Sequence, residues 1–363
     1  MDEFQGELNS EGIIAEDKFL TPDSKKKFLL IAAVTGGLIL LLIIIIILIT
    51  SSKGSTTNKK YGEIICQYDI SDTNSYVQIL GDKFNNLNKL GIFIDKNQTK
   101  SSRTALFKKT GINEVIFEIY SQSINLDYMF QDIPELIYVN LTSNNNIKID
   151  SMISTFENCG NLNNFYIKGF NLDNVKSMKN LFSNSKISDF TGLSTKNVED
   201  FSYMFASIDA SYIELDNIDT SNAKNMSHMF ENTNVNSLDL HKFNTRKVED
   251  MSYMFKGSEG LLGLELNNFV TSNVKNMQGM FLNCISLISV DLTSFDTSQV
   301  TDMSRMFESD NSMLSLDLSN FDTSKVQNMS HMFYYATNLN YLKIDKFNTG
   351  QVKDMSYMFT LIR

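Results

Sequence analysis

The stretch Phe295-Asp-Thr-Ser-Gln-Val-Thr-Asp-Met-Ser-Arg-Met-Phe307 has close copies along the second half of the chain. Its last residue marks a repeat, because a phenylalanine returns in this place ten times with gaps of 23 to 26 residues. Self-similarity at about 20–29 residues indicates a solenoid, whose stacked coils bury a core that one coil alone could not bury. The ten positions are Phe130, Phe156, Phe182, Phe205, Phe230, Phe255, Phe281, Phe307, Phe333 and Phe359.

Each coil combines two hydrophobic spacings. Leu287, Val290 and Leu292 end in an alternation that is typical of a strand with one buried face. An Asp-Thr-Ser run, typical of turns and helix caps, then leads to apolar residues at the spacing of a short helix. These are Val300, Met303, Met306 and Phe307, which we interpret as core rather than as a cofactor or peptide groove. The predicted fold class is therefore an α/β solenoid.

Together with the preceding Leu-x-x-Val-Asp-Leu, the 295–307 stretch resembles the BspA-like variant of the leucine-rich repeat, which is widespread in surface proteins of bacteria and some single-celled eukaryotes. The match runs from about residue 126 to 363 and is most specific over 230–359, whereas Thr155 and Leu181 replace the methionine of the pattern in two earlier coils. The resemblance implies a right-handed solenoid with a parallel sheet on one side, an adhesion or binding role, and no enzymatic activity. It does not imply a particular ligand.

The first 60 residues predict a membrane anchor. Residues 1–27 form a polar tail that ends in three lysines, residues 28–49 are almost entirely apolar, and residues 50–60 read as a flexible stalk. Twenty-two helical residues span about 33 Å, which is enough to cross a bilayer and too long for a cleaved signal peptide. We therefore predict one transmembrane helix at 28–49 that acts as an uncleaved signal anchor.

Lysines near the two ends of this anchor decide its predicted orientation. Lys25–Lys27 directly touch the apolar run, whereas Lys53, Lys59 and Lys60 are more spread out. We therefore place the N-terminus in the cytoplasm and the repeats outside the cell or in a lumen. Four Asn-x-Ser/Thr sequons are compatible with that side and are glycosylation candidates: Asn97, Asn140, Asn225 and Asn328.

Residues 61–123 are predicted to form a β-rich N-terminal cap on the solenoid of residues 124–363. A solenoid needs a polar cover on its first coil, and this block lies at the right place in the chain. It also contains a possible short helix near Lys83–Asn88. Its β-type runs, separated by turn residues, are Glu63–Ile70, Val77–Leu80, Leu90–Asp95 and Glu114–Tyr120.

Charge and cysteine content exclude some functions. The net charge of -10 argues against sequence-independent nucleic-acid binding, which needs a basic face. Cys159 and Cys284 occupy the same slot of coils about 24 Å apart, too far for a disulfide, and are expected to be buried thiols. The state of Cys66 is left open.

Two columns of side chains are predicted to point outward from the coils. The first is the residue between the last two apolar positions of each strand, which is acidic in five consecutive coils and could attract a basic ligand or be merely solvated. The second is the variable residue of Met-Ser-x-Met-Phe, a candidate protein interface because it is rich in Tyr and Arg. The ligand-face candidates are Glu214, Asp239, Glu265, Asp291 and Asp317. The interface candidates are Tyr128, Tyr203, His228, Tyr253, Arg305, His331 and Tyr357.

The sequence contains no recognisable catalytic, cofactor or metal motif. His228, His241 and His331 lie beside no plausible nucleophile and orienting acid, and no glycine-rich phosphate loop or Cys/His metal spacing is present. A flat column of single carboxylates offers too few oxygens for calcium. The Asp/Asn-Thr pair at each corner is expected to be structural. We therefore predict a chain that is not an enzyme and that has no cofactor and no metal.

These observations predict a single-pass surface protein whose repeats bind protein or glycan ligands. An alternative is a self-associating structural component of a surface coat or an endomembrane. Only four residues follow Phe359, so the last coil has no polar cover, and we expect its end to associate with a second copy or with a partner, unless the sequence is an incomplete gene product.

Overall fold

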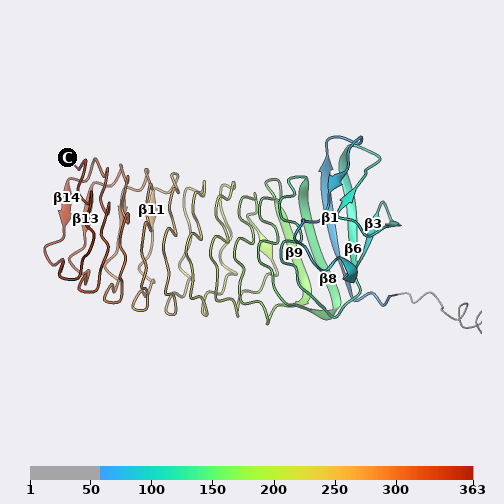
Figure 1. The fold of residues 1–363 in the computed structure, drawn as a ribbon, viewed down its shortest axis with the longest axis horizontal. Coiled ribbons are helices and arrows are strands. Elements are labelled where there is room, and N and C mark those ends of the chain that lie inside the picture. The colour runs from blue at the N-terminus through green and yellow to red at the C-terminus, as the bar shows by residue number, and fades with distance from the viewer. Residues whose placement is uncertain (1–57, 363) are drawn as a thin grey trace, which may run out of the picture. The chain divides into compact units, whose positions relative to one another are not determined.

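The repeats fold into a β-solenoid whose coils stack along one axis (Figure 1). The structure is a computed structural model that describes residues 58–362. The predicted cytoplasmic tail (1–27), the transmembrane anchor (28–49) and most of the stalk (50–60) lie outside the described residues. Within residues 58–362, no helix combines the length and the apolar character that a membrane span requires.

The N-terminal cap is rich in β-structure, as predicted, and its longest strands are β1 (Gly62–Ile70) and β6 (Gly111–Ile119). Side chains on β1 are alternately buried, because one face of the sheet packs on the core. The single 3₁₀ turn of this region, η2 (Leu87–Lys89), lies close to the predicted short helix. The other strands are β2 (Val77–Gln78), β3 (Leu90–Ile94), β4 (Asn97–Thr99), β5 (Thr104–Ala105) and β7 (Ser123–Ile124).

One sheet joins the cap to the first coils. Its strand order is β10-β9-β8-β1-β6-β3-β4, in which β8 (Leu136–Ile149), β9 (Asn164–Asn171) and β10 (Phe190–Thr191) are parallel and belong to the solenoid. Strand β1 pairs antiparallel with both β8 and β6. The cap therefore supplies hydrogen bonds to the edge strand of the first coil, which would otherwise be open.

The later coils carry much shorter strands. Strand β11 (Gly263–Leu264) pairs in parallel with β12 (Ser289–Val290), and β13 (Ser315–Asp317) pairs in parallel with β14 (Tyr341–Lys343). Equivalent residues of successive coils face each other in both pairs, for example Leu316 and Leu342. The register therefore repeats the sequence period.

The predicted helix in each coil is wrong, and a ribbon of tight turns stands in its place. Alternate amides bond to the next coil: Met277 N–H donates to Asp302 O at 3.0 Å and Gly279 N–H to Ser304 O at 2.8 Å. The amide of Met280, which lies between those of Gly279 and Phe281, closes a turn instead and donates to Met277 O at 3.3 Å. Two residues per coil also have a left-handed backbone, such as Arg305 with a φ of 60°, and an α-helix cannot contain them.

The apolar residues assigned to that helix are nevertheless buried. Val274, Met277, Met280 and Phe281 have no exposed surface, and the equivalent residues of neighbouring coils are equally covered. The ten repeat phenylalanines form one continuous column with ring centroids 5.5–6.2 Å apart. The interpretation of these residues as core is confirmed, because a ribbon of turns can bury the same residues as a helix.

Buried threonines join the corners of successive coils. Thr271 Oγ1 donates to Asp296 O at 2.9 Å and accepts Asp296 N–H at 2.8 Å, and Thr245 makes the same pair of bonds with Val270. The preceding residue caps the turn within its own coil, as Asp296 Oδ1 accepts Ser298 N–H at 3.0 Å. Each Asp/Asn-Thr pair thus satisfies backbone groups, as expected from the sequence.

Candidate binding surfaces

The acidic column lies on an exposed strand face. All five ligand-face candidates are exposed, and each follows an inward-facing side chain of its coil: Glu214, Asp239, Glu265, Asp291 and Asp317. Pairing of equivalent residues, as between Asp317 and Lys343, places successive members one strand apart, which is about 4.8 Å. The structure therefore brings these carboxylates together in one row.

Local donors stabilise the ionised form of three of these carboxylates. The His241 side chain, 2.6 Å from Asp239 Oδ1, lowers the pKa of Asp239. The backbone N–H of Thr293 lowers the pKa of Asp291. The side chain of Ser319 and its N–H lower the pKa of Asp317, assisted by Lys343 at 3.3 Å. These three carboxylates are consequently anionic at neutral pH.

Sequence reasoning missed an apolar row beside these carboxylates. Leu262, Ile288 and Leu314 occupy the same slot of three successive coils and are 59%, 51% and 51% exposed. The sequence does contain a signal for this row. The same position of the repeat is polar in the two flanking coils, at Asn236 and Asn340, and changes to an aliphatic residue in the three coils between them. Because these three aliphatic side chains are exposed in neighbouring coils, they form a contiguous apolar patch. Single exposed apolar residues are common and form no such patch.

Three consecutive interface candidates form a stack, and most of the others are only partly exposed. Tyr203, His228 and Tyr253 stack with ring centroids 4.1 and 4.8 Å apart. Tyr128, Arg305 and His331 are also only partly exposed, whereas Tyr357 is 61% exposed. Most of these side chains are therefore less exposed than expected, and for Tyr203, His228 and Tyr253 the reason is that each ring lies against its neighbour in the next coil.

An ion-paired centre lies beside this stack. Glu231 accepts from Lys256 Nζ at 2.7 Å and contacts His228 Nδ1 at 2.5 Å. Burial alone would raise the pKa of Glu231, but its hydrogen bonds with His228 and Lys256 lower it overall. Lys256 Nζ also lies 5.6 Å from the Tyr253 ring centroid. The charges of this centre are thus neutralised within the rod, and the column holds coils together more than it offers groups to a ligand.

One group of side chains has the spacing of metal ligands. Among residues 58–362, the ligating atoms of Asp216, Asp239 and His241 lie within 4.8 Å of one another. All three residues are exposed, and Lys242 Nζ forms an ion pair with Asp216 Oδ2 at 2.8 Å. The ammonium group supplies the charge that a cation would otherwise provide, so this group makes a poor metal site.

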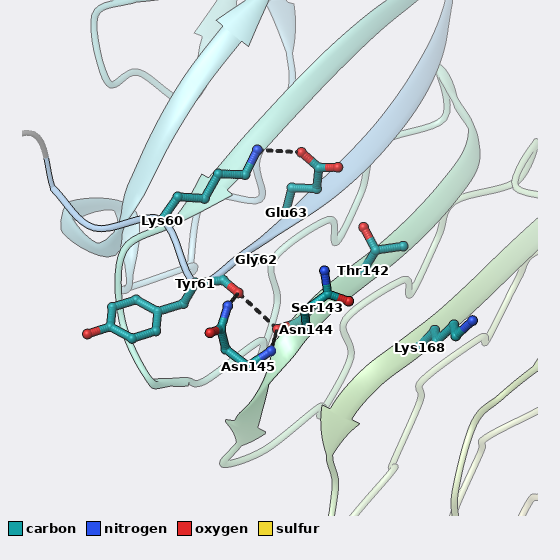
Figure 2. Close-up of a pocket in the computed structure, with 9 residues that line it drawn as sticks. All are labelled: Lys60, Tyr61, Gly62, Glu63, Thr142, Ser143, Asn144, Asn145 and Lys168. Carbon is teal, nitrogen blue, oxygen red and sulfur yellow. Dashed lines mark hydrogen bonds and ion pairs between the residues drawn. The ribbon is translucent and has the colours of Figure 1, made fainter.

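A polar depression of about 470 Å³ lies where β1, β8 and β9 meet (Figure 2). Ser143 Oγ and Asn145 Nδ2 both donate to Tyr61 O, which ties a bulge in β8 to the start of β1. Lys60 on its rim forms ion pairs with Glu63 at 2.6 Å and Glu118 at 2.9 Å. These internal bonds fix the junction between cap and coils and leave few free groups for a ligand.

The sequons differ in accessibility. Asn97 is exposed on β4, whereas Asn140 lies half-buried within β8. Asn225 and Asn328 are half-buried, and their amide oxygens accept the backbone N–H two residues later at 2.9 and 3.0 Å. Asn97 is therefore the best acceptor of the four.

The three cysteines are buried free thiols. The expectation for Cys159 and Cys284 is confirmed, and Cys66, left open by the sequence, is buried in the cap. Burial raises the pKa of all three thiols, which therefore stay protonated at neutral pH. Cys159 Sγ and Cys284 Sγ each point at the phenylalanine carbonyl of the preceding coil, at 2.9 and 3.1 Å.

Comparison with known proteins places the coils in a family. No curated protein and no solved structure matches the chain. The sequence model of one family, described as "Mycoplasma protein of unknown function, DUF285", matches three overlapping segments at residues 124–234, 200–313 and 263–362. Because these matches cover the whole solenoid and more than half of the 363 residues, the chain belongs to the DUF285 family.

Proposed function

We propose that this protein is a single-pass, membrane-anchored surface protein whose BspA-like repeats bind protein or glycan ligands without catalysing a reaction. Its N-terminus would lie in the cytoplasm and its solenoid outside the cell or in a lumen. The proposal combines the apolar run at 28–49 with the repeat surface of residues 124–362.

The repetition of exposed side chains in register is the observation that carries this proposal. Carboxylates and aliphatic residues recur at the same slots of successive coils, with a spacing of about 4.8 Å. Such a regular array of side chains presents many equivalent groups to a large partner at once. Catalysis instead needs a few different groups that converge on one point. Three depressions among the described residues, beside Lys60, Lys224 and Thr301, are also open and lined mostly by polar residues.

Surface labelling of intact cells tests location and orientation together. Cells that express the full chain are treated with a membrane-impermeant amine reagent, which should label the lysines of the repeats and leave the tail lysine Lys18 unmodified until the cells are opened. Labelling of Lys18 alone in intact cells would contradict the orientation. Labelling of neither region would contradict the surface location.

Binding is tested with the purified full chain held in lipid nanodiscs. Retention on protein- or glycan-coated surfaces, with the chain remaining a single copy per disc, supports recognition. Discs that cluster through the chain while no foreign surface is bound would favour the coat alternative and contradict the proposal.

A further inference from the structure

The apolar row of Leu262, Ile288 and Leu314 lies immediately before the short strands β11, β12 and β13, and we call the exposed side of these coils, from the apolar row to the acidic row, the strand face. The next residue in each of these coils is small, namely Gly263, Ser289 and Ser315. Two residues further on comes the acidic row, with Glu265, Asp291 and Asp317. The aliphatic and the acidic residue of one coil are three positions apart, so their Cα atoms are separated by at most about 11 Å, and both side chains are exposed because the aliphatic residue precedes the strand.

Exposed tyrosines mark the two ends of this strand face. The slot that holds small residues over four coils, from Ser237 to Ser315, holds Tyr212 at one end and Tyr341 at the other. These two tyrosines are 57% and 54% exposed. Between the two tyrosines, this position holds no side chain larger than serine in four successive coils, which leaves the surface low along this part of the rod. A partner could therefore approach the backbone here and contact both the aliphatic and the acidic rows.

The charge of the strand face discriminates between partners. If a second copy packed on it by the same face, it would bring two acidic rows together, with chains that each carry a net charge of -10. A polyanion such as nucleic acid would be repelled for the same reason. A cationic partner would gain from the row of carboxylates, and its aliphatic side chains would cover the exposed leucines and isoleucine.

The spacing of the coils suits an α-helix that lies along the rod. Side chains on one face of a helix recur with each turn of about 5.4 Å, which is close to the coil repeat of about 4.8 Å. Over the three aliphatic coils the mismatch grows to only about 1 Å. An extended chain laid in this direction advances about 6.6 Å between side chains on the same face, so it loses register faster.

We propose that this strand face binds a cationic amphipathic helix of a partner protein. Leucine-type residues of the helix would pack on Leu262, Ile288 and Leu314, and lysines or arginines on its adjacent side would pair with Glu265, Asp291 and Asp317. This inference rests on the proposed function as a binding protein and assigns the partner class and the surface.

The test uses the full chain in nanodiscs made of a zwitterionic lipid, immobilised on a biosensor. The probe is an 18-residue helical peptide of leucine and lysine, with leucines at every turn of one face. A peptide with glutamate in place of lysine and empty nanodiscs are the controls. The lysine peptide should bind above the empty discs, the glutamate peptide should not, and raising the salt concentration should weaken binding.

Two sets of substitutions locate the site. Combining L262S, I288S and L314S should reduce the affinity for the lysine peptide about tenfold or more, because the apolar contact is lost. The isosteric set E265Q, D291N and D317N should also weaken binding and remove its salt dependence. L106S, which changes a leucine of the cap that is also 51% exposed, is the matched control and should leave the affinity unchanged.

The outcomes separate this inference from the proposed function. Equal binding of the lysine peptide to wild type and to both sets, or no binding above empty discs, overturns the assignment of this face. If the chain still binds foreign proteins or glycans in that case, the proposed function stands and only the partner class falls. Circular dichroism of each variant checks that the solenoid is intact.

Discussion

At the scale of single residues, Asp310 is the most unusual side chain of the core. It is fully buried, accepts Cys284 N–H at 2.9 Å through Oδ1, and its Oδ2 has no hydrogen-bond partner among the described residues. Burial raises the pKa of this carboxyl well above its ordinary value. In the two preceding coils the equivalent position holds Ser258 and Cys284, and each of these side chains donates a hydrogen bond to a phenylalanine carbonyl. Asp310 could donate in the same way only if its carboxyl group is protonated.

We predict that D310N stabilises the protein at neutral pH. The folded carboxyl keeps its proton to a higher pH than the unfolded one, so the wild type loses stability as the pH rises from about 4 towards the folded pKa. Asparagine keeps the acceptor for Cys284 N–H and adds a donor that does not titrate. Thermal unfolding should show a higher midpoint for D310N at pH 7 and a much smaller difference at pH 4. A lower midpoint for D310N at pH 7 would contradict this account.

Sequence patterns predicted burial more accurately than they predicted exposure. The Met and Phe positions could be assigned to the core because their spacing is the same whether the backbone is a helix or a ribbon of turns. The Tyr203, His228 and Tyr253 column was misjudged, because stacking between coils depends on a left-handed backbone that non-glycine residues rarely adopt. The carboxylates of the candidate strand face could be found from alternation alone, and the aliphatic row beside them was overlooked.

At the scale of the element, the difference between a helix and the observed ribbon lies in where the amides bond. In a helix they bond within the segment, whereas here alternate amides of residues such as Phe281 bond to the next coil, with Met306 O at 3.0 Å. A single coil's periodicity does not reveal this choice, because the competing acceptors lie 22 to 25 residues away in the next coil. The coil period and the number of residues per coil could be read from the sequence, but the backbone path between the apolar positions could not.

The buried threonines offer a test of the bonding between coils. T271V keeps the shape of the side chain and removes both of its bonds to Asp296, whose backbone N–H and C=O lose this partner at a partly buried corner. We expect a loss of about 2 kcal/mol in the free energy of unfolding, measured by chemical denaturation. T293V is the matched control, because Thr293 is exposed and bonds only within its own coil. Equal effects of the two substitutions would show that the corner threonine does not join the coils.

The phenylalanine column offers a second test at this scale. Phe255 is fully buried between the rings of Phe230 and Phe281, so F255A should leave a cavity and cost about 3–5 kcal/mol. Phe359 belongs to the same column but is 50% exposed, so F359A should cost clearly less. Denaturant unfolding of the two variants compares the same substitution in two environments. A cost for F359A as large as that for F255A would contradict the observed stacking order.

At the scale of the whole molecule, the sequence predicted a solenoid and a β-rich cap because both depend on features that repeat or alternate locally. The continuity of the cap with the coils through β1 and β8 was not predictable, since it pairs segments about 75 residues apart that share no pattern. The mixture of antiparallel cap and parallel coils in one sheet follows from that single pairing. The proposed binding function depends on this arrangement through the surface that the coils expose, whereas the proposed anchor depends on the apolar run at 28–49.

The most direct test of the stacked coils is the distance between two spin labels on the strand face, measured by pulsed electron paramagnetic resonance. Labels at T191C and D317C, both at exposed positions of equivalent slots, are five coils apart, while the three native cysteines are buried. Coils stacked in register predict one narrow distribution centred at about 24 Å, with an allowance of several ångströms for the label arms. A broad distribution, or a separation well beyond that range, would contradict the solenoid on which every binding surface described here depends.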